Sequence, residues 1–382
     1  MSRINDLIKE LCPKGVEYKQ LDVVCKINKG KQLNKERLLS NGRYPAVNGG
    51  ITPSGYWDEY NYDENMITIS QGGASAGYVA YQLTKFWAGA HCYVVEKSDK
   101  NVVYKYLYHF LKSKQVDLQK SQVGAGIPSV SLKEIYGLKI PIPPLEVQKE
   151  IVEILDKFDE LEAELEAELE ARKSQYEFWR GNLVNINTQK YKLNEIANIY
   201  DGTHSTPNYQ LSGVPFISVE NINDIYNSNK FISKEDYAKY KIKPMINDVF
   251  MTRIGSIGKC AVFEKQVDLA YYVSLALIRP NNNIISSRYL KYYLESSIGR
   301  DELYKKTLTH AVPIKINKDD IGKINVIVPS KEEQHCIVNI LDKFDALVND
   351  ISEGLPAEIE LRKQQYEYYR NKLLSFEEFL NE

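Results

Sequence analysis

The chain repeats itself, and this long internal repeat restricts the possible architectures more than any other feature of the sequence. Residues 148–159 read QKEIVEILDKFD and residues 334–345 read QHCIVNILDKFD, which agree at nine of twelve positions. Farther along, RKSQYEFWR at 172–180 agrees with RKQQYEYYR at 362–370 at six of nine positions. A repeat of about 190 residues indicates duplicated domains rather than the units of a solenoid. We therefore expect the 382 residues to form two similar halves.

Each half divides into a basic part and an acidic part. Residues 1–140 carry 19 Lys and Arg against 13 Asp and Glu, and residues 184–328 carry 19 against 14. The following segments are acidic, with 5 against 12 in residues 141–183 and 6 against 12 in residues 329–382. Because salt screens charges that lie more than about 10 Å apart, the net charge of −2 does not exclude a polyanionic partner. The basic parts are the candidates for binding phosphates.

The acidic part of each half has the apolar spacing of a long helix. From Val147 to Leu165, apolar residues recur at alternating steps of four and three, which is coiled-coil spacing. Gly354 and Pro356 predict a break in the second copy. Neither apolar stripe can be buried alone and the two are alike, so we expect the helices to pack antiparallel on each other. The residues expected in this contact, or in docking a partner, are Ile151, Leu155, Phe158, Tyr176, Trp179, Ile337, Leu341, Phe344, Tyr366 and Tyr369.

The basic parts show short apolar runs separated by turn residues. Runs such as MITIS (66–70) and DVFMTRIG (248–255) predict strands, and segments such as VYKYLYHFLKS (103–113) predict helices. We therefore predict an α+β fold with two similar domains, two long antiparallel helices and a pseudo-twofold internal repeat. The predicted boundaries are 1–143 for the first domain, 144–186 for the first helix, 187–329 for the second domain and 330–382 for the second helix.

The sequence is typical of a soluble cytoplasmic protein. No window approaches the ~18 consecutive apolar residues of a membrane span, and residues 1–20 lack the apolar core of a signal peptide. The five cysteines are scattered and include no CxxC pair. This usage indicates reduced thiols rather than a disulfide framework or a zinc site.

No motif predicts catalysis by this chain. The GGASAG run at 72–77 lacks the spacing of a dinucleotide-binding loop. The segment ending in Gly258-Lys259-Cys260 fails as a phosphate loop, because Arg253 replaces the first glycine and Cys260 replaces the Ser or Thr that binds magnesium. The histidines form no metal-ligand pair at helical spacing, and no motif for amino-group methylation of DNA is present. We expect a protein with no active site and no metal of its own.

Polar loops in the two basic parts are the candidates for nucleic-acid contact. Each part contains a strand, a Gly/Ser loop and another strand, and each begins with a further polar loop. Glycines allow close approach of a backbone to phosphate, and Ser, Arg, Lys and Gln can bond to phosphates or base edges. The candidate DNA-binding residues are Lys29, Lys31, Gln71, Gly73, Ser75, Thr203, His204, Thr206, Arg253, Ser256 and Lys259. Tight hairpin turns and plain surface loops explain the same patterns about equally well.

The order of these segments resembles the specificity (S) subunit of Type I restriction–modification systems over essentially the full length. The resemblance rests on the duplicated QxxIVxILDKFD and RKxQYExxR segments and on GLPAEI at 354–359. It implies that the two domains are target recognition domains, each reading one half of a bipartite double-stranded DNA target. It also implies that the helices are conserved spacers, which set the gap between the half-sites and dock two modification (M) subunits.

The same resemblance implies that this chain is not an enzyme. Adenine methylation with S-adenosylmethionine would belong to the M subunits, and ATP- and Mg-dependent restriction would belong to restriction (R) subunits of the full complex. Two alternatives stay open at this point. The chain could serve a Type II system with a fused nuclease–methyltransferase, or it could be a coiled-coil adaptor that does not bind DNA.

Overall fold

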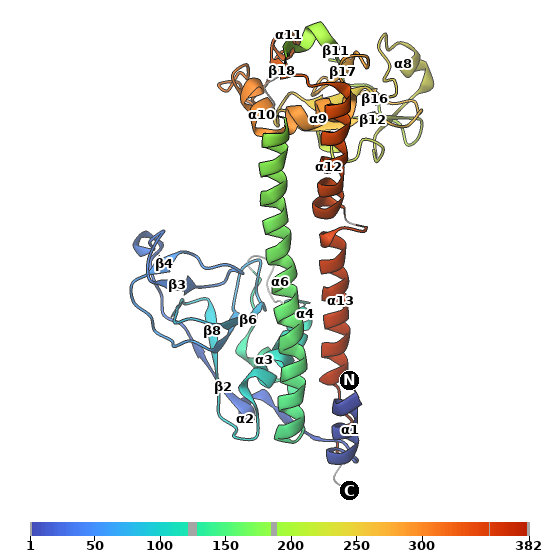
Figure 1. Ribbon diagram of the computed structural model, residues 1–382. Helices are drawn as coiled ribbons and strands as arrows, with labels where there is room; N and C mark the ends of the chain where they lie inside the picture. The colour runs from blue at the N-terminus through green and yellow to red at the C-terminus, as the bar shows by residue number, and fades with distance from the viewer. Residues whose placement is uncertain (1, 121–127, 185–188, 351, 380–382) are drawn as a thin grey trace. The chain divides into compact units, whose positions relative to one another are not determined.

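The computed structural model describes residues 2–120, 128–184, 189–350 and 352–379, and these residues form two compact units (Figure 1). The first unit comprises residues 1–165 and 359–382, and the second comprises residues 166–358. Each unit therefore contains one α+β domain together with parts of the long helices. The predicted boundary between residues 186 and 187 lies outside the described residues.

The domain of the first unit contains two sheets. The four-stranded antiparallel sheet has the order β2 (Cys25–Lys29), β8 (Cys92–Lys97), β5 (Met66–Ser70) and β6 (Val79–Gln82). The three-stranded sheet has the order β4 (Tyr56–Trp57), β3 (Tyr44–Val47) and β7 (Trp87–Ala88), with β3 and β7 parallel. A separate ladder pairs β1 (Glu17–Gln20) with β9 (Lys139–Ile142).

The domain of the second unit repeats this topology strand for strand. Its four-stranded sheet has the order β11 (Ala197–Asp201), β17 (Leu275–Pro280), β14 (Val249–Thr252) and β15 (Cys260–Val262). Its three-stranded sheet has the order β13 (Phe231–Ile232), β12 (Val214–Ile217) and β16 (Ala270–Tyr271), and β12 and β16 are parallel. Its ladder pairs β10 (Lys190–Lys192) with β18 (Asn325–Ile327). The predicted similarity of the two domains is therefore confirmed.

Helices of the domains connect the sheets to the long helices. The main domain helices are α3 (Tyr104–Ser113) and its counterpart α9 (Ser287–Glu295), and Figure 1 shows α3 between the four-stranded sheet and α6. The remaining helices are α1 (Ser2–Leu11), α2 (Leu21–Val24), α4 (Gln115–Lys120), α5 (Leu132–Tyr136), α7 (Leu193–Ile196), α8 (Lys234–Ala238), α10 (Ser297–Tyr304) and α11 (Lys318–Gly322). Short 3₁₀ turns lie at Lys35–Arg37 and Val219–Asn221.

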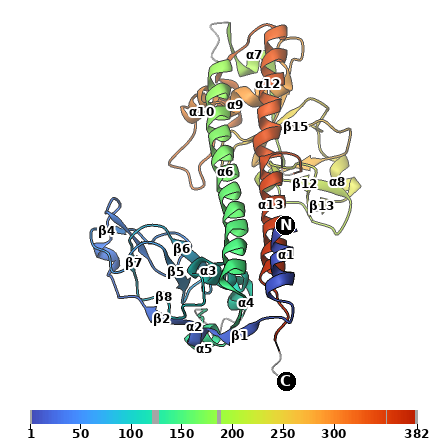
Figure 2. The same ribbon diagram turned by 60° about the horizontal axis from the view of Figure 1, so that its bottom comes forward.

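The acidic parts form long helices, as the apolar spacing predicts. The first is continuous, α6 (Leu145–Leu183), and the second is divided into α12 (Lys331–Asn349) and α13 (Leu355–Leu373). Ser330 and Glu333 form the capping box that starts α12. The break falls where Gly354 predicts it, and a Cβ on this glycine would lie 2.5 Å from the carbonyl oxygen of Ala346. Within the first unit, both views show α13 beside the first part of α6 (Figure 2).

Each unit has its own main hydrophobic core, built from its domain and its helix segments. Ile151 and Leu155 of α6 are fully buried in the core of the first unit. Ile337 and Leu341 of α12 are buried in the core of the second. Within the described part of the chain, no helix is both long enough and apolar enough to cross a membrane.

Candidate nucleic-acid interface and helix contacts

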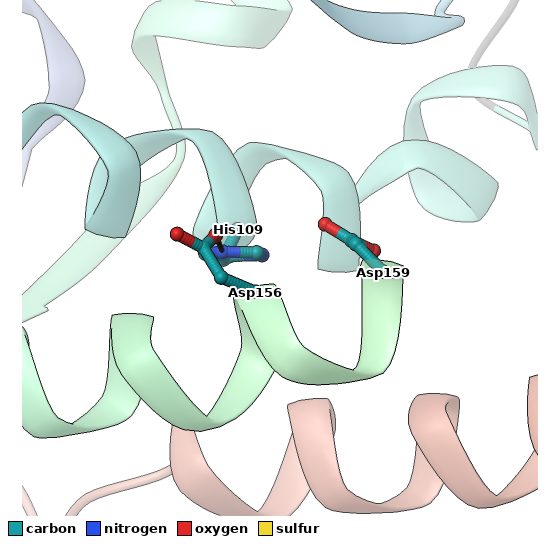
Figure 3. Close-up of side chains that lie close together, drawn as sticks. All are labelled: His109, Asp156 and Asp159. Carbon is teal, nitrogen blue, oxygen red and sulfur yellow. Dashed lines mark hydrogen bonds and ion pairs between the residues drawn. The ribbon is translucent and has the colours of Figure 1, made fainter. Parts of the chain in front are cut away.

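The repeated LDKFD motif of α6 holds the first domain through a buried polar cluster (Figure 3). His109 of α3 is fully buried, and its Nε2 lies 2.9 Å from Oδ1 of Asp156. Lys105, one helical turn earlier, donates to the other carboxylate oxygen at 2.7 Å. On the opposite edge of the ring, Nδ1 of His109 lies 3.3 Å from the hydroxyl of Tyr366 in α13. One domain side chain thus contacts both long helices.

The second unit contains the same cluster, but here the second copy of the repeat supplies the aspartates and the first copy supplies the tyrosine. Tyr292 of α9 occupies the place of His109 and donates to Asp342 at 2.6 Å. Arg288 occupies the place of Lys105 and lies 2.7 Å from the second oxygen of Asp342. The hydroxyl of Tyr176 in α6 lies 3.4 Å from Oδ1 of Asp345.

Aromatic contacts join the two repeated motifs of each unit. In the first unit, Phe158 of α6 stacks on Tyr366 and Tyr369 of α13, with 5.7 Å between the ring centroids in each pair. In the second unit, Phe344 of α12 stacks on Tyr176 of α6 at 6.3 Å. In each unit, therefore, the LDKFD motif of one helix meets the QYE motif of the other.

Arginines complete this arrangement. Arg370 lies over the Tyr366 ring at 5.1 Å, and Arg180 lies over the Tyr176 ring at 5.0 Å. In the first unit, Phe158 contacts Tyr369, and Glu162, farther along α6, pairs with the earlier Lys363 of α13 at 3.4 Å. The two helices therefore run antiparallel. The predicted fold class, α+β with two similar domains, antiparallel helices and an internal repeat, is confirmed.

A repeated glutamine fixes the start of each helix against its domain. Gln148 accepts a hydrogen bond from the amide of Val103 at 2.8 Å and donates to the carbonyl of Pro143 at 2.7 Å. Gln334 makes the equivalent bonds to Ser286 at 2.8 Å and Pro329 at 2.9 Å. Since both amides are fully buried, these bonds satisfy groups that would otherwise destabilise the fold.

Burial and hydrogen bonding act in opposite directions on the acidic residues of the cluster. Burial disfavours the charged form of Asp156, but hydrogen bonds from His109 and Lys105 outweigh it and hold the pKa of Asp156 below its usual value. Asp159 is more deeply buried, and desolvation raises its pKa although Tyr366 donates a hydrogen bond to it.

His109, Asp156 and Asp159 also have the composition of a small metal site. Their candidate ligand atoms lie within 4.8 Å of one another. The second unit, however, places Tyr292 where His109 lies and keeps the bond to the matching aspartate. A position that either a phenol or an imidazole can fill is a hydrogen-bonding position, so we assign the cluster to domain docking.

Four of the residues expected in the helix contact also pack against their domains. Ile151, Leu155, Ile337 and Leu341 are core residues of their units, packed with domain side chains, rather than members of a seam between helices only. Trp179 is 40% exposed and packs edge-to-face on Phe178. Phe158, Tyr176, Phe344, Tyr366 and Tyr369 do lie in the helix contact.

Because His109 of the first unit corresponds to Tyr292 of the second, we expect two substitutions of His109 to have unequal effects. His109→Ala should lower the free energy of unfolding by about 2–4 kcal/mol, because it opens a cavity and removes hydrogen bonds to Asp156 and Tyr366. His109→Tyr should retain most of that stability, since a phenol makes the same bond in the second unit. Urea unfolding of the full chain measures both; equal losses for the two variants would contradict the docking role.

The environment of Lys112, which also lies on α3, predicts that the stability of the protein depends on pH. Desolvation, aided by the nearby Arg370, lowers its pKa to about 8. Between about pH 8 and the unfolded value near 10.4, the unfolded chain binds more protons than the folded chain, so stability should rise with pH in this window. Lys112→Met should abolish about 1–3 kcal/mol of this rise. Unfolding midpoints of the wild type and of Lys112→Met, measured at pH 7.5 and 10, test this. Parallel curves of stability against pH for the two proteins would contradict the prediction.

Four loops of the first domain converge where strands β2, β3, β5 and β7 end. The amide of Lys31 donates to the carbonyl of Ala88 at 2.8 Å. The Ser70 hydroxyl donates to the carbonyl of Gly49 at 2.7 Å. His91, in the loop after β7, links the loops after β3 and β5, since its amide donates to the Asn48 side chain and its carbonyl accepts from the amide of Gln71, both at 2.9 Å. These bonds form one polar face from segments far apart in the sequence.

The candidate residues of the first domain lie on or beside this face. Lys29 and Lys31 are exposed at the end of β2, and Gln71, Gly73 and Ser75 are half-buried in the loop after β5. Gly73 has a φ of +87°, and no atom lies within 4 Å of where its Cβ would be. The turn alone therefore explains this glycine, and the open space leaves its backbone accessible.

In the second domain the candidate residues separate into three groups. Thr203, His204 and Thr206 lie in the loop after β11, which matches the loop of Lys31. Ser256 and Lys259 border a cleft of about 1430 Å³ that is also lined by Tyr176 and Asp345, so they face the long helices of their unit.

Arg253 does not lie where we expected it. Its side chain is buried, pairs with Asp201 and donates from Nε to the carbonyl of Ile316 at 3.2 Å. The guanidinium group is therefore part of the scaffold, and the expectation that it binds phosphate from the surface is wrong. The sequence suggested a surface cation because Arg253 adjoins a Gly/Ser loop, but its partners are 52 and 63 residues away.

Sequence reasoning missed several polar residues that the structure brings to these loops. They are Asn48, His91, Asn208, Lys241 and Tyr271. The NGG run at 48–50 carried a usable turn signal, whereas the others become neighbours of the loops only through the strand order of the sheets.

Two α+β domains of one topology, each docked on long helices, define a duplicated two-domain protein. Comparison of the sequence with known families identifies which kind. Residues 13–171 and 185–361 match the Type I restriction modification DNA specificity domain, and the chain belongs to this family.

Relatives agree with this assignment, and solved structures share the fold. The chain is 30% identical to a putative type I restriction enzyme specificity subunit of Haemophilus influenzae, covering 94% of this chain and 96% of the relative. It is 32% identical to the EcoR124I/EcoR124II specificity subunit of Escherichia coli over 74% of this chain and 73% of that protein. The fold is similar to the S subunit of M. genitalium, with a TM-score of 0.60, 19% identity and coverage of 94% and 96%. A chain from a study of assembly and conformational transition of the type I R-M system matches with a TM-score of 0.64, 19% identity and coverage of 95% and 98%.

Proposed function

We propose that this chain is a non-catalytic specificity subunit in which each domain reads one half of a bipartite DNA target. The observation that carries the proposal is the repetition of one topology with different side chains at the loop face. The loop after β2 offers Lys31, whereas the matching loop after β11 offers Thr203, His204 and Thr206. Two readers with different side chains select two different half-sites.

The long helices carry a second duplicated surface, suited to two copies of one partner. Phe178 of α6 and Tyr368 of α13 occupy equivalent positions in the repeat, and each is 61% exposed. Each packs edge-to-face on the next aromatic, Trp179 or Tyr369. Exposed aromatic pairs of this kind are typical of protein–protein contacts. In the proposed complex these pairs dock two modification subunits, to which methylation with S-adenosylmethionine belongs, and restriction subunits join the full assembly.

The number of modification subunits bound to each copy of this chain tests this docking. Phe178→Ala should remove one modification subunit, Tyr368→Ala should remove the other, and the double variant should bind neither. Tyr304→Ala is the matched control, because Tyr304 is 69% exposed but lies outside the long helices. Native mass spectrometry of the assembled complex measures the ratio; a two-to-one complex with the double variant would contradict the assignment.

DNA binding tests the reading role directly. With modification subunits present, the wild-type protein should bind its methylation target more tightly than a duplex with scrambled half-sites, with affinity falling as salt rises. Equal affinity for both duplexes at every salt concentration would contradict sequence recognition.

A further inference from the structure

The second domain contains an open pocket of about 480 Å³ beside its loop face. One wall is the loop after β11, from Asp201 to Asn208, and the other is the end of α8 and the segment that follows it, residues 236–242. Tyr271 of β16 also lines the pocket. The pocket lies wholly inside the second unit, so one domain supplies the whole site.

The loop wall is held rigidly. A Cβ on Gly202 would lie 2.4 Å from the carbonyl oxygen of Tyr272, so only glycine allows the loop to approach β16 this closely. The Thr203 amide donates to the carbonyl of Tyr271 at 3.1 Å, and the Thr203 hydroxyl accepts from the amide of Ser205 at 3.3 Å. Thr203 therefore fixes the loop, and its neighbours project from a preorganised backbone.

The charges of the pocket suit an anionic ligand. Two carboxylates line it, and each is neutralised by a partner: Asp201 pairs with Arg253, and Asp236 pairs with Lys239 at 2.6 Å. The hydrogen bond from Lys239 holds the pKa of Asp236 below its usual value. Lys241 is exposed and forms no ion pair with any residue that the structure describes, so it supplies the uncompensated charge.

The loop wall also carries polar side chains with no internal partner. Thr206 and Asn208 are exposed, and their side chains bond to nothing within residues 2–120, 128–184, 189–350 and 352–379. They are therefore available to a ligand that offers donors and acceptors.

We propose that the walls of this pocket contact the DNA half-site read by the second domain, with Asn208 and Thr206 contacting base edges and Lys241 contacting a phosphate. Asparagine can bond to the edge of an adenine through two atoms, and a hydroxyl can bond to any base. This assignment rests on the proposed function and names the residues that perform it in one domain.

Substitutions in the pocket separate base contacts from phosphate contacts. In the complex with modification subunits, Asn208→Ala should reduce discrimination at one position of the second half-site by about 5- to 150-fold and leave the first half-site unchanged. Lys241→Ala should weaken binding to all duplexes and lower the slope of log K against log salt by about 0.9. The matched controls are Asn229→Ala and Lys306→Ala, exposed residues of the same unit outside the pocket.

Thermal unfolding separates loss of a DNA contact from loss of the fold, because Asn208→Ala and Thr206→Ala remove exposed side chains and should keep the wild-type melting temperature. If wild-type complexes show sequence preference but Asn208→Ala and Thr206→Ala both bind like wild type, the pocket assignment is overturned and the proposed function stands. If the wild type shows no sequence preference, the proposed function itself fails.

Discussion

Deleting Leu165–Glu168 should shorten the gap between the two half-sites by one or two base pairs and leave both half-sites unchanged. These four residues are one LEAE unit of the tandem run at 161–171 in α6. Their loss shortens an α-helix by about 6 Å and rotates its end by about 40°. Since B-DNA rises about 3.4 Å per base pair, the shift corresponds to one or two base pairs.

The deletion leaves in place the contacts on either side of the deleted segment. The boundary between the compact units falls at residue 165, and Leu161 beside it is 48% exposed. Glu162 keeps its partner Lys363, and Leu169 keeps its place against the core of the second unit.

A length-preserving variant is the control for this deletion. Replacing Leu165–Glu168 with four alanines keeps the helix length and helix propensity, so the gap should not change. Sequencing of methylated adenines in cells that express each variant with its modification subunits gives the gap directly. A deletion variant that methylates the wild-type target would show that the helix does not set the distance.

The sequence predicted the helices well because their signals are local and repeated. The 4-3 spacing, the Ser330–Glu333 capping box and Gly354 each act within a few residues, and each appears in the structure as expected. The contacts that the repeated motifs make could not be predicted in the same way, because they join residues far apart in the sequence. Asp156 meets a histidine 47 residues away, and Tyr366 meets that histidine across 257 residues.

The candidate DNA contacts show the same division between local and distant signals. Glycine-rich loops were found because turns have local composition, and the loops of Lys31 and Thr203 do lie at matching strand ends. Arg253 was misplaced because its burial depends on Asp201 and Ile316, which only the folded sheet brings near. Asn208 and Lys241 were missed since they become neighbours only when the pocket walls assemble.

Exchanging residues 1–140 for the corresponding block of another family member should replace one half-site completely and leave the other half-site and the gap unchanged. The first domain reaches α6 and α13 through an apolar core that includes Ile151 and Leu155, and through polar contacts of Lys105, His109 and the Val103 amide. A donated block should therefore fold on this chain's helices if it keeps matching apolar residues and carries hydrogen-bond donors at positions 105 and 109. The reciprocal exchange of residues 184–328 should alter only the other half-site.

Docking and reading can be separated within the same experiment. A chimera whose donor block lacks both hydrogen-bond donors should lose stability, and restoring Lys105 and His109 should recover folding without restoring the original half-site. That result would place specificity in the loops and docking in α3. Two outcomes would contradict independent reading by the two domains: the restored residues bring back part of the original half-site, or either exchange alters both half-sites. The duplicated contacts of the LDKFD and QYE motifs would then have to transmit specificity as well as hold the fold.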